Sequence, residues 1–504
     1  MLDRYDAIVI GAGHNGLVAA AYLARAGARV IVLERSGVVG GAARTEETWP
    51  GYRVSTASYV CSLFDPQIVA ELELPAHGFS AYPKWPSSFT PLLDGRSLLL
   101  GVDAQSDAAE IAAFSRRDVD GYAAFLASAS ALGAEVFVHA HDERPRLADL
   151  DAKIVAEFDS PVASFVERFV ETPVLAATLA TDGLIGTYAG PFDPGTTYVL
   201  AHHYAGRIFG EQGAWGFVRG GMGALSRAVA SSATAAGVEI AGDSEVVAIR
   251  AGDAELSVET SSGRVFHARA VLSNADPRTT FLRLCPIDAF DAAFVARVHA
   301  WRAEGVSFKV NLALGELPNF VARKGTNAQL HHRATIHVAG DLNYLQRAHD
   351  DARLFGSSRA PMLECFMQTP TDPSLAPAGK HILSVFAQYF PYSKAAGWTA
   401  AEKAAAVQTI VETLAQYVHN LPDVIEEWDV LSAADIESRI GIAQGHIFHG
   451  ELLPGQIFEG RFDVRTPLSG LYLCGSGTHP GGCVTGVPGR RAARAVLADL
   501  PALV

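Results

Sequence analysis

The first part of the chain shows an apolar pattern that predicts a strand, a helix and a second strand in immediate succession. Residues 7–10 are Ala-Ile-Val-Ile, a run without a polar position that is typical of a buried strand. A glycine-rich turn follows, and residues 17–25 are rich in alanine and leucine, which favours a helix. Gly27 ends that helix, and residues 28–33 return to a mostly apolar run that ends at Glu34. The pattern therefore predicts a strand–helix–strand unit of an α/β fold.

Two later regions repeat this kind of pattern. A glycine-rich turn at 220–223 precedes a helical segment that ends at Gly237, and alternating strand segments follow from 244 to 273. Near the other end, residues 470–475 predict a turn and a short buried strand. A further glycine-rich loop then leads into an alanine-rich helix. Three widely separated segments thus place a glycine-rich turn before a helix.

Composition places the chain among large globular proteins. It has 504 residues, of which 49% are hydrophobic and 19% are charged, and its mean hydropathy is +0.16. These values exclude a disordered chain and fit a large buried interior or an apolar cavity. No uncharged apolar run of about 18 residues occurs, so no transmembrane helix is expected. The formal net charge of −14 argues against non-specific nucleic-acid binding, which needs a basic surface.

The five cysteines show no pairing pattern. Their number is odd, and no two of them are spaced as C-x-x-C. This argues against a disulfide framework, a tetrathiolate metal site and a dithiol redox centre. We therefore expect reduced cysteines and a cytoplasmic compartment. The first strand also begins without the basic start, apolar stretch and cleavage site of a signal peptide.

The turn after the first predicted strand carries the strongest chemical pattern. Residues 11–16 are Gly-Ala-Gly-His-Asn-Gly, a G-x-G-x-x-G motif between a predicted strand and a predicted helix. In such a turn Gly11 permits the tight bend, Gly13 lets a pyrophosphate approach the backbone, and Gly16 lets helix and strand pack closely. The helix start offers free N–H groups to phosphate oxygens. Glu34 is placed to accept hydrogen bonds from ribose hydroxyls and would repel a 2′-phosphate, so NADP is disfavoured.

The residues that follow distinguish between dinucleotides. Glu34-Arg35 is followed by Gly40-Gly41 and Arg44, and this pattern, E-R-x-x-x-x-G-G-x-x-R, resembles the flavoprotein superfamily of amine oxidases, phytoene desaturases and GDP-dissociation inhibitors. The resemblance implies FAD, with the second glycine pair and Arg44 continuing the diphosphate cradle. The chain has no second G-x-G-x-x-G motif at 220–223 and no paired cysteines, which argues against the two-nucleotide disulfide reductases.

The C-terminal loop resembles the same group. Residues 471–477, Leu-Tyr-Leu-Cys-Gly-Ser-Gly, and 479–482, His-Pro-Gly-Gly, are similar to the C-terminal flavin motif of phytoene dehydrogenase-like proteins. The resemblance implies that Gly475 and Ser476 lie beside the ribityl-diphosphate. It also implies that the helix start at 484–487 faces the flavin pyrimidine edge, where the helix dipole favours the anionic reduced flavin.

The resemblance extends to the middle segment, where Val246 would contact the adenine through its backbone. The residues expected to bind FAD, non-covalently, are Gly11, Gly13, His14, Asn15, Gly16, Glu34, Arg35, Gly40, Gly41, Arg44, Ser58, Val246, Asn274, Gly475, Ser476, Gly482, Val484, Thr485, Gly486 and Val487.

The resemblance covers nearly the whole chain and implies an α/β, Rossmann-type FAD-binding domain with an interleaved α+β substrate domain. We expect the FAD-binding domain to comprise residues 1–83, 216–282 and 455–504, and the substrate domain to comprise 84–215 and 283–454. In this superfamily the second domain encloses a mainly apolar substrate tunnel.

Candidates for proton transfer are few. His449 and Glu451 precede the C-terminal flavin strand and could face the flavin, and capping or core packing is the alternative role for both. His479 lies beside the flavin loop, and an ordinary histidine pKa near physiological pH would let it act as an acid or a base. The alternative for His479 is to structure the loop through hydrogen bonds.

Other segments carry weaker patterns. The adjacent histidines at 202–203 and 331–332 are not expected to bind a metal, because neighbours in sequence seldom face one centre, so no metal site is expected. Residues 175–188 are apolar with Asp182 among them. They would form a tunnel wall or a membrane-facing helix, and ordinary core packing is the alternative.

These observations favour an FAD-dependent oxidoreductase that acts on carbon–carbon bonds of a hydrophobic, polyene- or lipid-like small molecule. Desaturation, saturation and double-bond isomerisation all fit, with hydride passing between a substrate carbon and flavin N5 in a dry site. The sequence Cys483-Val484-Thr485 departs from that of carotenoid desaturases, which puts a carotenoid substrate in doubt.

Two alternatives stay open. An FAD-dependent amine or amino-acid oxidase predicts an aromatic cage, which the sequence does not show clearly. A non-enzymatic lipid- or partner-binding protein would reuse the fold of the GDP-dissociation inhibitors. We expect no nucleic-acid partner, while peripheral membrane contact and the oligomeric state are left open.

Overall fold

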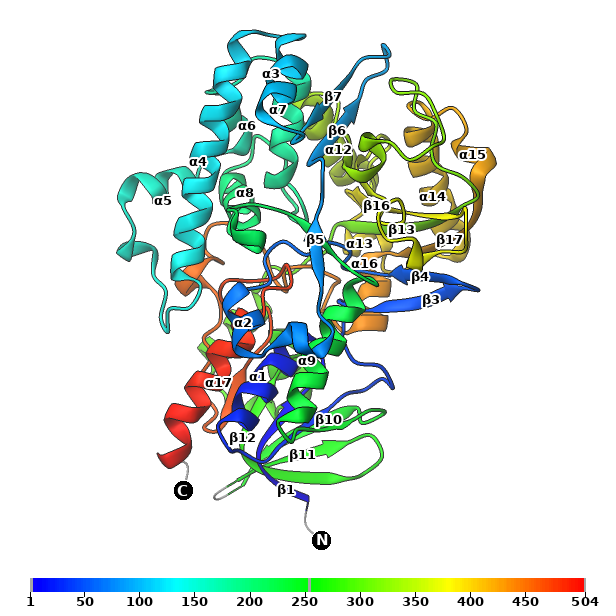
Figure 1. Ribbon diagram of the computed structural model, residues 1–504. Coiled ribbons are helices and arrows are strands. Elements are labelled where there is room, and N and C mark those ends of the chain that lie inside the picture. The colour runs from blue at the N-terminus through cyan, green and yellow to red at the C-terminus, as the bar shows by residue number, and fades with distance from the viewer. Residues whose placement is uncertain (1–2, 253–254, 503–504) are drawn as a thin grey trace.

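A mixed seven-stranded sheet forms the base of the molecule in Figure 1. The computed structural model describes residues 3–252 and 255–502. The strand order is β10-β11-β12-β1-β2-β9, with β18 also paired to β12. β1 pairs in parallel with both β12 and β2, as crossover helices require. The bounds are β1 Asp3–Ile10, β2 Val30–Leu33, β9 Glu239–Ala241, β10 Val246–Ala251, β11 Leu256–Thr260, β12 Val265–Ser273 and β18 Leu471–Leu473.

Three helices cover one face of this sheet. α1 (His14–Arg25) packs against both α9 (Met222–Ala235) and α17 (Val487–Asp499), as Figure 1 shows. Glycine allows the close approach of α17, because a Cβ at Gly489 would lie 2.1 Å from the backbone oxygen of Asn15. The strand–helix–strand unit and the Rossmann-type sheet predicted from the sequence are therefore confirmed.

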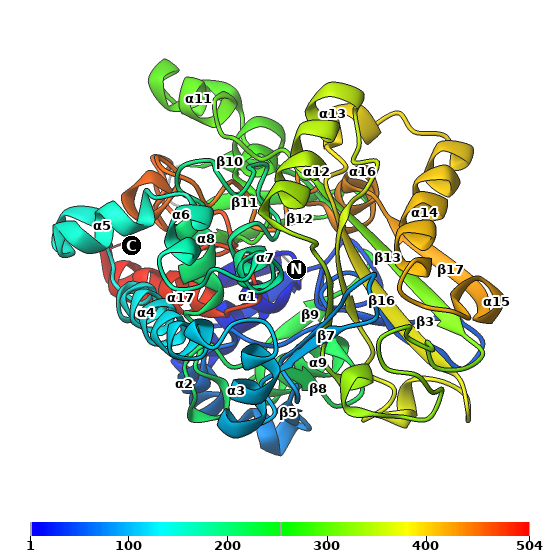
Figure 2. The same ribbon diagram turned by 90° about the horizontal axis from the view of Figure 1, so that it is seen from above.

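A second seven-stranded sheet lies above the first in Figure 1. Its order is β17-β13-β16-β15-β14-β6-β7, and the β14–β6 pair is its parallel pair. α14 (Ala400–Ala415) and α15 (Leu421–Val424) cover one face, where Ile410 and Leu414 are buried (Figure 2). The bounds are β6 Ser88–Pro91, β7 Ser97–Leu100, β13 Ser307–Leu314, β14 Thr335–Val338, β15 Met362–Phe366, β16 His381–Gln388 and β17 Ile425–Leu431.

The opposite face of the second sheet is turned toward a group of helices (Figure 2). Met362 and Phe386 of the sheet share one buried cluster with Phe125, Phe165 and Leu179 of these helices. The bounds are α3 Ala104–Ala112, α4 Arg117–His139, α5 Ala152–Phe158, α6 Val162–Glu167, α7 Pro173–Ala180, α8 Thr196–His203 and α12 Leu342–Phe355. The remaining helices and strands are α2 Pro66–Glu71, α10 Pro277–Thr279, α11 Ala292–His299, α13 Tyr392–Ala395, α16 Ala433–Asp435, β3 Thr45–Trp49, β4 Tyr52–Ser55, β5 Ala81–Pro83 and β8 Gly216–Val218.

The two sheets take their strands from alternating stretches of the chain. The first sheet uses strands from 3–33, 239–273 and 471–473, and the second uses strands from 88–100 and 307–431. The short antiparallel pair of β5 and β8 lies where the chain leaves the first region and returns to it. Neither sheet is therefore built from one continuous segment. The exact domain boundaries that the sequence analysis gives stay predictions.

Among the described residues, α4 is the one helix whose length and composition would let it cross a membrane. This does not contradict the expectation that the chain has no transmembrane helix, which stays a prediction. Phe125, Leu132 and Val136 pack into the helical core, and a single helix of this kind is weak grounds for a membrane span.

Candidate cofactor and active site

Direct backbone packing closes the turn between β1 and α1. Gly11 has a φ of +92°, a conformation that glycine adopts without strain. A Cβ at Gly16 would lie 2.2 Å from the carbonyl oxygen of Gly11, so only glycine fits there. A Cβ at Gly13 would lie 2.8 Å from Nδ2 of Asn274, and this amide donates to the Gly11 carbonyl at 3.3 Å. The turn therefore holds the unpaired N–H groups at the start of α1 in a fixed position, where an anion can bind.

Glu34 is fixed beside this turn. Its side chain is buried, and Oε2 accepts a hydrogen bond from the Ala12 N–H at 2.7 Å. Oε1 accepts from the N–H and the hydroxyl of Ser36, both at 3.0 Å. A carboxylate has lone pairs left after these bonds, so Glu34 can still accept from ribose hydroxyls as the sequence predicts.

The second glycine pair lies against the first turn. The Gly40 N–H donates to the Ala12 carbonyl at 2.8 Å. Nη2 of Arg44 donates to Oγ of Ser36 at 2.8 Å and to the Val38 carbonyl at 2.9 Å, which leaves Nε buried and without a partner. The guanidinium is therefore anchored with one donor free beside the turn.

The C-terminal loop meets the first turn although the two are far apart in the chain. Nδ2 of Asn15 donates to Oγ of Ser476 at 3.1 Å. The Cys474 N–H donates to the Ser273 carbonyl at 2.9 Å, and a Cβ at Gly475 would lie 2.9 Å from the Asn274 backbone oxygen. The pairing of β18 with β12 thus brings the last motif to the first.

A cavity of about 390 Å³ lies where these segments meet. Its wall also includes His449, one of the predicted proton-transfer candidates. The predicted FAD-binding residues on the wall are Gly11, Gly13, His14, Asn15, Glu34, Arg35, Gly41, Arg44, Val246, Asn274 and Ser476.

The other predicted FAD-binding residues lie outside this wall: Gly16, Gly40, Ser58, Gly475, Gly482, Val484, Thr485, Gly486 and Val487. Gly16 and Gly475 lie behind it, where they permit close packing. Ser58 is tied by its N–H to the Ala42 carbonyl at 3.0 Å. Residues 482–486 belong to the loop before α17 and Val487 begins that helix. Their contact with the flavin stays a prediction.

Sequence reasoning missed one whole side of the wall. Glu437 and residues 440–443 line it from the second region of the chain, and Arg283 and Thr279 line it from the segment after β12. The one signal in the sequence was Gly441, which ends a helical turn at a φ of +90°. A Cβ at this glycine would lie 3.3 Å from Nη1 of Arg35, so glycine also leaves room for that guanidinium. Nothing in that segment resembles a nucleotide motif.

The donor set of the cavity fits a dinucleotide diphosphate. Nε2 of His14 and Nε of Arg44 are buried without hydrogen-bond partners, and a buried donor without a partner is costly. Burial lowers the pKa of His14 to about 4, so its ring is neutral and can donate one hydrogen bond. Both side chains lie on the cavity wall with the α1 N-terminus, and the same wall includes the Glu34 carboxylate that suits a ribose.

Comparison with known proteins agrees with this arrangement. The family model described as flavin containing amine oxidoreductase matches residues 16–292, more than half of the chain. The chain belongs to this family. It is 39% identical to pyridine nucleotide-disulfide oxidoreductase domain-containing protein 2 of Rattus norvegicus, over 99% of this chain and 94% of that protein. It is 28% identical to a phytoene desaturase (lycopene-forming) of Pseudescherichia vulneris, over 95% and 96% of the two chains.

Among solved structures, wild-type putrescine oxidase bound to putrescine matches 99% of each chain with a TM-score of 0.63 and 15% identity, a likeness of fold. As a member of the flavin-containing amine oxidoreductases, the protein is an oxidoreductase that binds FAD non-covalently. The expected fold class and cofactor are thus confirmed.

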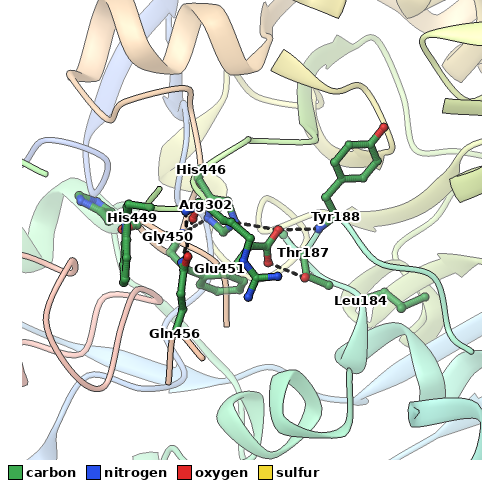
Figure 3. A network of polar contacts seen from close by, with 12 residues as sticks. Leu184, Thr187, Tyr188, Arg302, His446, His449, Gly450, Glu451 and Gln456 are labelled. Atoms are coloured by element: carbon green, nitrogen blue, oxygen red, sulfur yellow. Dashed lines mark hydrogen bonds and ion pairs between the residues drawn. The ribbon is translucent and has the colours of Figure 1, made fainter. Parts of the chain in front are cut away.

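Glu451 joins two regions of this flavoprotein (Figure 3). Oε2 accepts from Oγ1 of Thr187 at 2.6 Å, and Oε1 accepts from the Tyr188 N–H at 3.0 Å. Nε2 of His446 lies 3.4 Å from Oε1. Burial alone would raise the pKa of Glu451, but His446 and these hydrogen bonds hold it below its ordinary value. Glu451 does not line the cofactor cavity, and its carboxylate ties residues 187–188 to the 446–451 segment, so the geometry gives it a positioning role.

His449 differs from Glu451 because it reaches the cavity. Its Nδ1 is buried without a partner, and its backbone oxygen accepts from Nε1 of Trp301 at 3.1 Å. Burial, together with the nearby His14, Arg461 and His446, lowers the pKa of His449 to about 3. The ring is therefore neutral at physiological pH and can donate or accept a hydrogen bond without carrying charge.

His479 is buried at 2% exposure, and neither ring nitrogen has a hydrogen-bond partner. The ring therefore adds no hydrogen bond to the loop, whereas the His479 carbonyl accepts one from Nη1 of Arg491 at 2.7 Å. The ring packs 4.8 Å from the Phe458 ring instead. Burial and the neighbouring Arg491 and Arg461 hold its pKa well below the ordinary value, which argues against a protonated His479.

Arg461 is a further residue that sequence reasoning missed. Its guanidinium is buried and donates to backbone carbonyls on two segments. These hydrogen bonds tie residues 448–456 to residues 476–486, which we call the flavin loop. Nη2 donates to Ser476 at 2.7 Å and to Phe448 at 2.9 Å, and Nε donates to Thr478 at 3.2 Å. Nη1 donates to the Glu451 carbonyl at 3.2 Å. A single arginine thus fixes the loop that carries Ser476.

The loop before α17 holds two residues in the left-handed region. Cys483 has a φ of +71° and Val484 a φ of +57°. Such conformations are costly for residues with side chains and persist where the surrounding structure enforces them. Sγ of Cys483 lies 3.7 Å from Nε2 of His203.

No cluster of three or more metal-ligating side chains occurs in residues 3–252 and 255–502. The adjacent pairs at 202–203 and 331–332 are buried beside aromatic rings. Burial lowers the pKa of His202 to about 3, which leaves it neutral in this apolar setting.

Proposed function

We propose that the protein oxidises, reduces or isomerises a carbon–carbon bond of a hydrophobic substrate. The observation that carries this proposal is the similarity to a phytoene desaturase along 95% of the chain, together with an FAD-type cavity whose wall combines the first, middle and last motifs. When bound, FAD supplies a site that takes up or gives back a hydride.

The chain's own residues would hold the cofactor and keep water away from the reacting atoms. The α1 N-terminus, His14 and Arg44 hold the diphosphate, and Glu34 holds the ribose. Arg461 fixes the loop that carries Ser476, which keeps the wall rigid. Hydride transfer needs such fixed positioning and the exclusion of water.

An amine oxidase is the second candidate. It is favoured by the family model and by the likeness of fold to putrescine oxidase. That likeness rests on 15% identity and concerns the fold alone.

The experiment compares flavin reduction by two classes of donor without oxygen. FAD-loaded protein is mixed with phytoene in detergent, with a long-chain saturated acyl compound, or with putrescine, and the visible absorption of oxidised flavin is followed. We expect bleaching by a hydrophobic donor and none by putrescine. Bleaching by the amine alone, with hydrogen peroxide formed when air is admitted, would replace the proposal with an amine oxidase.

A further inference from the structure

One face of the second sheet carries buried polar side chains beside Met362 and Phe386, which pack against the helices. Along β13, Phe308, Val310 and Leu312 point into the apolar cluster beneath α14, so Lys309 and Asn311 point to the opposite face. The same alternation puts further polar side chains on that face, and all of them are shielded from solvent. They are Thr335 and His337 of β14, Glu364 of β15 and Ser384 of β16.

Lys84 extends over this polar face from the segment that follows β5. Its ammonium donates to the Ser87 carbonyl at 2.6 Å and to Oγ1 of Thr335. The same nitrogen lies 5.4 Å from the Trp215 ring centroid and 5.7 Å from that of Phe366. Cation–π contacts of this kind stabilise an ammonium but do not neutralise it.

A second ammonium lies farther along the same face. Nζ of Lys309 donates to Oδ1 of Asn311 and lies 4.6 Å from the Tyr59 ring centroid. The rings of Tyr59 and Phe366 are 4.6 Å apart, so aromatic groups separate the two lysines. Across the described ranges 3–252 and 255–502, neither lysine has a carboxylate within 4.0 Å.

Of the two acids near Lys84, Asp182 supplies negative charge and Glu364 does not. Burial, with Asp182 nearby, raises the pKa of Glu364 to about 8, which keeps its carboxyl protonated at neutral pH. Oε1 of Glu364 has no hydrogen-bond partner although the side chain is 2% exposed. The nearest basic atom is Nδ1 of His337 at 3.7 Å, and burial lowers the pKa of His337 to about 3. Burial raises the pKa of Asp182 to about 6, so it alone carries a negative charge here.

Short contacts connect this polar face to the flavin loop. The Trp215 ring, which contacts Lys84, stacks on His203 at 6.0 Å with an interplanar angle of 26°. Nε2 of His203 lies 3.7 Å from Sγ of Cys483, directly after the Gly481-Gly482 pair of the flavin loop. These contacts join the surroundings of Lys84 to the flavin loop.

We infer that Lys84 and the carboxyl of Glu364 bind the carboxylate of the substrate, which is thus a hydrophobic carboxylic acid. The inference rests on the proposed function and narrows its substrate class. Lys84 supplies the counter-charge, and the unpartnered Glu364 oxygen, bearing its proton, donates a hydrogen bond to the acid group. Lys309 lies farther along the same face, where burial lowers its pKa to about 7.

The test measures binding, so it does not depend on turnover. FAD-loaded protein is titrated with dodecanoate, dodecanol and dodecylamine, and the shift of the visible flavin spectrum gives each dissociation constant. We expect dodecanoate to bind about tenfold or more tightly than dodecanol, because a charge-assisted hydrogen bond is gained, and dodecylamine to bind more weakly than both.

The variants make the assignment specific. Lys84→Met should remove the preference for dodecanoate while dodecanol binding is kept, and Lys84→Arg, which keeps the charge, should retain the preference. Lys153→Met makes the same change on the exposed surface of α5 and should leave all three constants unchanged. If Lys84→Met does not load FAD, Lys84→Arg and Glu364→Ala decide the matter, since the first should keep the preference and the second should weaken it.

Equal binding of the acid and the alcohol, or an acid preference that survives Lys84→Met, would overturn the inference. Tighter binding of dodecylamine would assign the face to a cationic group held by Asp182. These outcomes are independent of the proposed function: bleaching by an uncharged hydrophobic donor with no acid preference would keep the function and reject the inference. If the protein prefers the acid through Lys84 but no hydrophobic donor bleaches the flavin, the inference is kept and the proposed function is rejected.

Discussion

At the scale of single residues, the cofactor site depends on groups that have little freedom. Gly16 is fixed by the Gly11 carbonyl, and Glu34 by hydrogen bonds from Ala12 and Ser36. His14 and Arg44 keep one unpaired donor each beside the cavity. These atoms are prepared for phosphate and ribose before any ligand arrives, which lowers the cost of ordering them on binding.

Gly16→Ala should abolish FAD retention. The new Cβ would lie 2.2 Å from a backbone oxygen, so the turn or α1 must shift, at a cost of about 1–3 kcal/mol. The ratio of bound flavin to protein after purification checks this. Gly397→Ala is the matched control, because nothing lies within 4 Å of a Cβ there. Equal flavin content in both variants would contradict the packing role of Gly16.

His449→Gln should leave the pH dependence of flavin reduction unchanged. Burial lowers the pKa of His449 to about 3, so the ring stays neutral between about pH 5 and pH 8 and gains no proton there. Stopped-flow reduction across that range provides the measurement. Loss of an ionisation near neutral pH in the variant would show that His449 titrates during the reaction.

At the scale of elements, the segment from 446 to 461 locks the helical region to the flavin loop. Glu451 holds Thr187 and Tyr188 on one side, while Arg461 holds the backbone at Phe448 and Ser476 on the other. The sequence predicted the nucleotide turn and Glu34, because both follow from a local motif. It could propose Glu451 as a candidate but could not give its role, since its partners lie more than 260 residues away.

Glu451→Gln should lower the free energy of unfolding by about 2 kcal/mol at neutral pH, because an amide nitrogen would face a donor in place of one carboxylate oxygen. The pKa of Glu451 is lowered in the folded state, so its contribution is present above the unfolded value of about 4.3. That contribution is lost as pH falls through the folded pKa.

Denaturant unfolding of both proteins at neutral and at acidic pH checks this. The difference between wild type and variant should shrink in acid. Glu412→Gln, on the exposed face of α14, is the control and should change little at either pH. If the difference in the free energy of unfolding between wild type and Glu451→Gln grows in acid, the pKa of Glu451 is not lowered by folding.

At the scale of the whole molecule, the FAD cavity is shared between regions. Its wall takes residues from 10–44, 245–284, 437–449 and 476. The first and last of these stretches, and Val246 and Asn274 of the second, were predictable from glycine-rich motifs and from the family resemblance. The stretch at 437–443 was not, because it reaches the site through packing of the second region and carries no motif. The polar face of the second sheet was hidden for a similar reason, since it depends on how seven strands align.

FAD binding should therefore protect distant segments together. On addition of FAD to apoprotein, amide hydrogen exchange should slow in peptides covering 11–16, 437–443 and 474–477 to a similar extent, since all three contribute to one wall or its support. Peptides from α5, which contributes no residue to the wall, serve as the internal reference. Protection confined to 11–16 would mean that the second region does not close on the cofactor.

The pairing of β18 with β12, and of Ser476 with Asn15, has a consequence for biosynthesis. A ribosome adds about 5–20 residues per second and releases the N-terminal segments first. The nucleotide turn thus emerges long before the strand and loop that complete its cavity. During that interval the newly made chain exposes an unfinished sheet edge and an open phosphate cradle. The complete cavity can therefore form only after synthesis has passed residue 476.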